Sequence, residues 1–183
     1  MNQIAQHLDR KSKAALALLS GCRLQTLMSA SSDIQVGSAV IEVLSVSIQL
    51  DKRRFIVIES DWDETPEEWM NFHTLSVRIS ETPKNIRYAS SPPSNEGNYH
   101  FDHFSLHLGA ESPVATIEVL EASVVGERES VTYDAGLLIT RQDGLKVAIV
   151  RVDSILGSLL IAHTAADIAA ITEGLVVTSR YGV

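Results

Sequence analysis

The sequence predicts a single α+β domain over residues 1–183, predominantly antiparallel β-sheet with an N-terminal helix and two short helices. Three observations support this class. The chain has 183 residues, of which 45% are hydrophobic, which is enough for one well-buried core. Apolar residues recur with a helical period only near the N-terminus and alternate with polar residues along most of the remaining chain. Capping and turn residues separate these runs at short intervals.

The first predicted element is an amphipathic helix over residues 2–19. The apolar residues of its one face are Ile4, Leu8, Ala15, Leu18 and Leu19. Because they would form one stripe at 3.6 residues per turn, we expect the helix to dock on the sheet through them. Gly21 follows as a natural end of the helix.

Alternating runs predict ten strands after this helix. They cover residues 34–50, 54–60, 74–80, 85–89, 99–108, 114–125, 131–141, 145–152, 158–162 and 175–180. Tight turns at Asp51-Lys52 and Asp143-Gly144 join neighbouring runs into hairpins. The proline-containing residues 80–98 interrupt the pattern, so we expect an exposed connection there and a candidate seam between two sub-sheets.

Capping residues predict the two short helices. In "TPEEW", Thr65 would be the N-cap, with proline at the first helical position and Glu68 closing a capping box. In "TAAD", Thr164 and Asp167 repeat this arrangement, and Gly174 would end the second helix.

Composition narrows the classes of partner and compartment. The 23 acidic and 15 basic residues give a net charge of −8, which disfavours the basic surface that nucleic-acid binding needs. No apolar run approaches the roughly 20 residues of a membrane helix. The single cysteine, Cys22, cannot form an internal disulfide. We therefore expect a cytoplasmic protein of bacterial type that binds neither nucleic acid nor membrane.

An alternative localisation arises from "LLSGC", residues 18–22, which resembles the lipobox of bacterial lipoproteins. This resemblance implies a lipoprotein acylated at Cys22. The apolar run before the cysteine is shorter than a usual signal core, and Asp9 lies in a leader that is normally basic.

The stretch "ESDWDETPEEWM" contains both tryptophans of the chain and many carboxylates. Its candidate partner-binding residues are Glu59, Asp61, Trp62, Asp63, Glu64 and Trp69. Helix capping explains Glu67 and Glu68, but it does not explain Asp61 and Asp63, which precede the expected helix. An aromatic anchor surrounded by negative charge is typical of surfaces that bind a basic protein.

Three of the six histidines lie close together in "NYHFDHFSLHLG". In a helix, His100, His103 and His107 would share one face and, with Asp102, could bind the zinc of a metal-dependent hydrolase. In a strand, His103 and His107 would point to one face, and His100 and Asp102 to the other. The flanking turn residues favour the strand, so we expect no metal and no cofactor and keep the hydrolase as the alternative.

The function that the sequence favours is non-catalytic binding. The chain has no glycine-rich phosphate loop, no paired-cysteine metal spacing and no nucleophile elbow. Small acidic proteins of this kind resemble, in type and not in motif, bacterial immunity proteins, which neutralise a toxin by covering its basic surface. The resemblance implies an inhibitor with a basic protein partner such as a toxin. A structural subunit that forms a homodimer through an exposed strand is a further alternative.

Overall fold

The computed structural model describes residues 2–88, 98–154 and 156–182. Within these ranges, eleven strands and two helices follow in the order β1 (Asn2–Gln6), α1 (Arg10–Leu19), β2 (Arg23–Gln35), β3 (Ile41–Val43), β4 (Val46–Gln49), β5 (Phe55–Glu64), β6 (Asn71–Ser80), β7 (Asn98–Val125), β8 (Glu129–Arg141), β9 (Lys146–Arg151), β10 (Leu159–Ala162), α2 (Ala165–Ile171) and β11 (Val176–Gly182). The strands form one sheet, in which β1 runs parallel to β8 and the other pairings are antiparallel.

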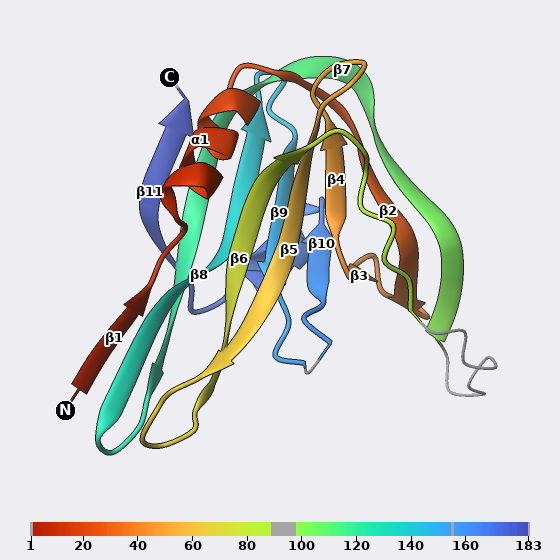
Figure 1. Ribbon diagram of the computed structural model, residues 1–183. Helices are drawn as coiled ribbons and strands as arrows, with labels where there is room; N and C mark the ends of the chain where they lie inside the picture. Colours follow the sequence, from red (N-terminus) through yellow and green to blue (C-terminus); the bar gives the residue numbers. More distant parts are fainter. Residues whose placement is uncertain (1, 89–97, 155, 183) are drawn as a thin grey trace.

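Two layers of this sheet face each other across the core (Figure 1). Strands β4, β5 and β6 make one layer, and β8, β9 and β10 make the other, with β6 in contact with β8 and β9. The long strand β7 connects them, because residues 98–113 pair with β2 and residues 114–125 pair with β8. Since β2 also pairs with β3 and β4, the path of pairings returns on itself through β3, β10 and β9.

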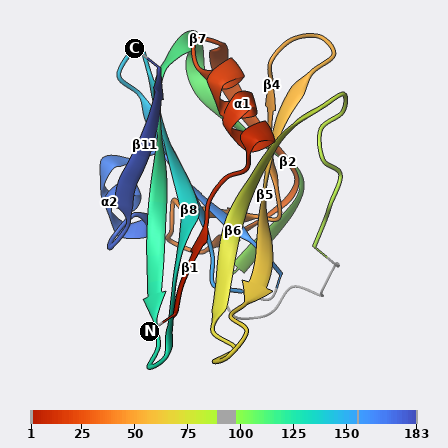
Figure 2. The ribbon, with the colours of Figure 1, turned by 60° about the vertical axis from the view of Figure 1, so that its left-hand side comes forward.

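Helix α1 covers one end of the core between the layers (Figure 2). The fully buried strand residues include Ile48, Ile56, Ile58, Leu137, Ile139 and Ile149. Ala15, Leu16 and Leu19 of α1 join the same cluster. The alternation of apolar residues along the strands therefore places one face of each layer in the core.

The predicted α+β class is wrong, although the predominance of antiparallel sheet is confirmed. The helices have only 10 and 7 residues, so the class is β-rich. Neither helix forms a layer of its own: α1 packs against β6, and α2 contributes no buried residue. Within the described ranges, neither helix is long and apolar enough to cross a membrane.

The predicted helix over residues 2–19 is wrong in its first half. Residues 2–6 form β1, which pairs with residues 129–133 of β8 on an edge that β9 leaves free, because β9 pairs with residues 136–140. The helix begins at Arg10, where the Asp9 carboxylate caps it by accepting a 2.7 Å hydrogen bond from the Ser12 N–H. Leu18, which we expected in the docking stripe, is exposed, and Leu16 is buried in its place.

Both hairpins and the second short helix are confirmed. Asp51 lies in the turn between β4 and β5, and Gly144 adopts a φ of 86° between β8 and β9. Thr164 caps α2 by accepting a hydrogen bond from the Asp167 N–H. Each of these features depends on interactions within a few residues, which sequence patterns capture well.

Other boundaries differ from the prediction. Strand β2 was not predicted, and the expected strand over residues 34–50 is divided into β3 and β4. Residues 85–88 form no strand. Residues 89–97 of the candidate seam at 80–98 lie outside the described residues. Ser80 is the last residue of β6 and Asn98 is the first residue of β7, and these two strands are not neighbours in the sheet.

Two single leucine-to-alanine variants in α1 should distinguish the contribution of core packing to stability from that of helix propensity. Leu16 is 0% exposed and Leu18 is 44% exposed. We expect Leu16→Ala to lower the free energy of unfolding by about 2–5 kcal/mol, since it leaves a cavity in the core. The matched control, Leu18→Ala, should change it by no more than about 0.5 kcal/mol. Urea denaturation of both variants measures this, and equal losses would contradict the packing described for α1.

Candidate functional site

The connection between β5 and β6 is a hydrogen-bonded turn and not the predicted helix. The N–H of Thr65 donates to the Met70 carbonyl, and the N–H of Met70 donates to the Thr65 hydroxyl, each at 3.0 Å. Trp69 has a φ of 55°, a left-handed conformation that is uncommon for a residue other than glycine. Because Glu64 already pairs with Asn71, the chain reverses here and leaves no length for a helix.

Two carboxylates fasten this turn to the neighbouring turn between β7 and β8. The Glu68 carboxylate accepts hydrogen bonds at 2.9–3.1 Å from three successive backbone N–H groups, those of Glu127, Arg128 and Glu129. In return, the buried Glu129 carboxylate accepts hydrogen bonds at 3.1 and 3.0 Å from the N–H groups of Glu67 and Glu68. Gly126 permits this approach, because a Cβ atom there would overlap the Glu68 carboxylate.

These hydrogen bonds stabilise both carboxylates in their charged form. The N–H of Glu129, followed by that of Arg128, holds the pKa of Glu68 below its ordinary value. Burial alone would raise the pKa of Glu129, but the Thr65 hydroxyl and the N–H groups of Glu68 and Glu67 lower it by more. Glu68, expected to close a capping box, instead joins two turns that are about 60 residues apart in the chain.

Both tryptophans are exposed on the surface formed by these two turns. We call residues 61–70 and 125–128 the acidic tip; Figure 1 shows the two turns side by side. Trp62 is 51% exposed and Trp69 is 70% exposed, and Val125 is also exposed. The indole N–H of Trp62 donates to the Asn71 side chain at 3.2 Å, which holds one ring in place.

The acidic tip carries four exposed carboxylates and one exposed cation, Arg128. Asp61, Asp63, Glu67 and Glu127 are exposed, and none makes an ion pair within residues 2–88, 98–154 and 156–182. Glu64, also a predicted site residue, is partly buried there. The tip therefore combines large apolar side chains with an excess of negative charge.

The structure removes one predicted residue from this surface and adds two that were not predicted. Glu59 lies outside it and forms ion pairs with Arg78 at 3.2 Å and Lys84 at 2.7 Å. Glu127 and Val125 belong to it but were not predicted, because they come from a turn far away in the sequence. The glycine and the charged residues of "VVGERE" indicate a turn at this place. No local pattern indicates that this turn lies beside the turn between β5 and β6.

The histidine stretch is part of β7, as the strand interpretation predicted. The histidines have different neighbours: His100 lies edge-on to Tyr88 (5.7 Å between ring centroids), His103 Nε2 lies 3.1 Å from the Arg87 guanidinium, and His107 Nδ1 lies 3.0 Å from the Thr26 hydroxyl. Asp102 lies 3.9 Å from Arg87. In the described part of the chain, no group of three or more His, Cys, Asp or Glu side chains is placed to hold a metal ion.

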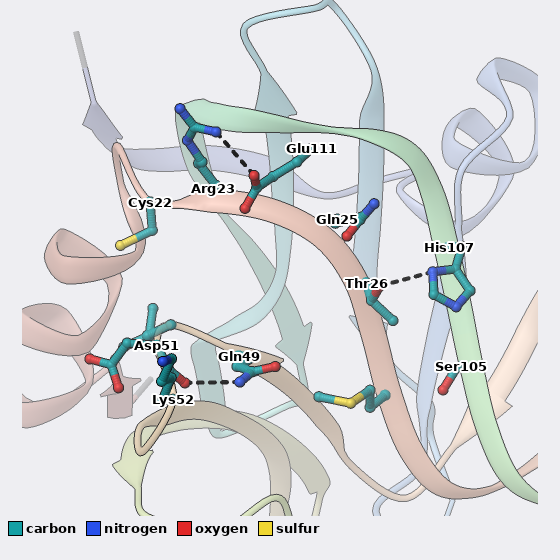
Figure 3. Close-up of a pocket in the computed structure, with 12 residues that line it drawn as sticks. Cys22, Arg23, Gln25, Thr26, Gln49, Asp51, Lys52, Ser105, His107 and Glu111 are labelled. Carbon is teal, nitrogen blue, oxygen red and sulfur yellow. Dashed lines mark hydrogen bonds and ion pairs between the residues drawn. The ribbon is translucent and has the colours of Figure 1, made fainter.

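His107 and Cys22 line a surface groove of about 610 Å³ between β2, β7 and the β4–β5 hairpin. Figure 3 shows them at opposite ends of this groove, so they form no nucleophile–base pair. The Cys22 thiol donates to the Leu18 carbonyl at 2.8 Å, and Arg23 pairs with Glu111 at 3.0 Å. Polar groups of the groove thus largely satisfy one another.

A polar cluster around the buried His73, which the sequence did not single out, joins β6 to the connection between β9 and β10. His73 is almost fully buried, and its Nε2 atom lies 3.3 Å from the Asp153 carboxylate. Burial and then the charge of Arg151 lower the pKa of His73. The Arg151 guanidinium donates to the Tyr133 hydroxyl and lies over that ring. This arrangement favours a neutral imidazole and ties the two layers together.

Neutralising Glu68 should destabilise the fold in a pH-dependent way. Its lowered pKa means that the charged form stabilises the folded state above the ordinary glutamate pKa of about 4.3, and that this contribution is lost as the pH falls through the folded value. We expect Glu68→Gln to lower the free energy of unfolding at about pH 7 and to have a smaller effect at about pH 3.

The matched control is Glu127→Gln, which removes an exposed carboxylate from the same pair of turns while leaving its backbone N–H in place. It should leave stability nearly unchanged, because exposed charges contribute little. Urea denaturation at both pH values gives the comparison. The same loss for Glu68→Gln at both values would show that its charge is not what holds the turns together.

Comparison with known proteins assigns no family to the chain. No protein-family model, no curated protein and no solved structure matches it. The arrangement of its own residues is therefore the basis for the function proposed next.

Proposed function

We propose that the chain is a non-catalytic binding protein that contacts a basic protein through the acidic tip. The observation that carries this proposal is the exposure of Trp69 on a turn held by carboxylate hydrogen bonds from both sides. A large apolar side chain that remains exposed in a well-ordered turn is typical of a binding anchor.

Rigidity of the tip supports the proposal. The turn that carries Trp69 is closed by its own backbone hydrogen bonds and is joined through Glu68 to a second turn. The left-handed backbone at Trp69 is the kind of strained conformation that persists where surrounding contacts determine it, and such conformations concentrate at functional sites. A pre-formed anchor loses little conformational entropy when it binds.

Charge supports a basic partner in particular. The four exposed carboxylates of the tip, Asp61, Asp63, Glu67 and Glu127, outnumber its one exposed cation, Arg128, and the chain has a net charge of −8. Local and overall electrostatic fields therefore act in the same direction and would accelerate encounter with a cationic surface. An immunity-type inhibitor that covers the basic active-site surface of a toxin is the setting that we propose for this chemistry.

Exchange of two tip charges tests the proposal. The chain is immobilised to capture its partner from the cells that make it, and the association rate of that partner is then measured at low and high salt. We expect Asp61→Lys with Asp63→Lys to slow association and to reduce its salt dependence. Trp69→Ala should accelerate dissociation and cost about 2 kcal/mol or more of binding free energy.

The matched control is Glu81→Lys with Glu173→Lys, which changes the net charge equally at exposed positions outside the tip. It should bind nearly as the parent does. If both double variants slowed association equally, the overall charge of the chain and not the acidic tip would account for the effect. A captured partner that binds the tip variants as fast and as tightly as the parent would exclude the tip as its binding surface.

A further inference from the structure

A cavity of about 390 Å³ lies between β2, β7 and the segment 81–88, which we call the strap. Strand β2 pairs with β4 at residues 27–28 and with β3 at residues 33–34. The residues between these two ladders have no strand partner on that edge in the described part of the chain, and the strap runs along them. The cavity is therefore built by the fold at a gap in the sheet and not by loose surface side chains.

Two hydrogen bonds from its backbone hold the strap in place. The N–H of Lys84 donates to the buried Ser47 hydroxyl, and the N–H of Tyr88 donates to the buried Ser31 hydroxyl, each at 3.0 Å. The strap thus forms a roof with a defined position, which is a property of pre-formed ligand sites.

Apolar groups make up much of the cavity wall. Met28 and Ala30 belong to β2, Phe104 belongs to β7, and Pro83 belongs to the strap. A volume of about 390 Å³ is near the lower end of the range of pockets that bind small molecules. The wall suits the apolar body of a ligand of modest size.

The charged side chains of the wall have one sign. Lys84 and Arg87 line the cavity, and no carboxylate among the described residues does so, although the chain as a whole has a net charge of −8. Lys84 is paired with Glu59 at 2.7 Å, whereas Arg87 lies a distant 3.9 Å from Asp102. Arg87 is therefore the cation with hydrogen-bond donors to spare.

The geometry around Arg87 also indicates that this part of the cavity wall is a ligand site. His103 Nε2 lies 3.1 Å from the Arg87 guanidinium and accepts a hydrogen bond from it, which orients the guanidinium. His103 has a φ of 57°, which is uncommon for histidine and is the second positive φ at a residue other than glycine in the described ranges. Such conformations concentrate at ligand sites.

We propose that this cavity binds a small amphipathic organic anion. Its apolar body would contact Met28 and Ala30, and its carboxylate would accept paired hydrogen bonds from the Arg87 guanidinium. The site is separate from the acidic tip, so neither proposal depends on the other.

Octanoate is a suitable ligand for testing the site. Isothermal titration calorimetry should show saturable binding of octanoate, and amide chemical shifts should change at Ser29, Ala30 and Phe104. Octan-1-ol should bind at least about tenfold more weakly because it lacks the charge, and acetate should do so because it lacks the apolar chain. Absence of saturable octanoate binding would overturn the proposal, as would equal affinity for octan-1-ol.

Variants locate the binding within the cavity. Arg87→Glu should weaken octanoate binding at least about tenfold, and Ala30→Leu should do the same by filling the floor with all charges retained. Arg10→Glu is the matched control, since it makes the same change of net charge on an exposed residue of α1 and should bind as the parent does. Equal weakening by Arg87→Glu and Arg10→Glu, or shift changes confined to the groove of Cys22 and His107, would overturn the proposal.

Discussion

The hydrogen bonding of β7 on both of its edges is the constraint on which the arrangement of the two layers depends. The N–H and C=O of Val114 bond to Cys22 and Gly21, whereas the C=O of Pro113 accepts from the N–H of Gln142. Adjacent residues of a strand direct their hydrogen-bonding groups to opposite edges, so β2 and β8 hold β7 from two sides at this point. The layers on either side of the core cannot separate without breaking one of these ladders. The end of the core that α1 covers therefore has a fixed width.

Charged side chains that are buried or partly buried connect segments that the strand ladders do not join. Arg141 donates to the Leu24 carbonyl at 2.9 Å, and the Asp134 carboxylate accepts from the N–H of Leu8 at 2.6 Å. The partly buried Glu68 and the buried Glu129 join the two turns at the acidic tip in the same way. In each case a charged side chain bonds to a backbone group from a distant segment, which offsets part of the cost of burying the charge and specifies which segments meet.

The two proposed surfaces use charge in opposite ways. At the acidic tip, Glu68 and Glu129 are occupied by backbone N–H groups, and the neighbouring Asp61 and Asp63 remain available to a partner. At the strap, the acidic side chains lie outside the cavity and the cationic ones face it. An acidic protein thus presents a negative surface at one place and a small positive cavity at another, which suits two ligands of opposite charge.

By itself the sequence determined the features that depend on near neighbours. The Asp51 and Asp143-Gly144 turns, the cap at Thr164 and the strand character of the histidine stretch follow from residues within one or two turns of chain. Only tertiary contacts decided that residues 2–6 form a strand, since the free edge of β8 offers hydrogen bonds that outweigh helical propensity. They also decided the turn at Thr65–Met70, the pairing of Glu68 with Glu129 and the cavity beneath the strap. These features join segments far apart in the chain, and no local pattern encodes which distant backbone groups a side chain will meet.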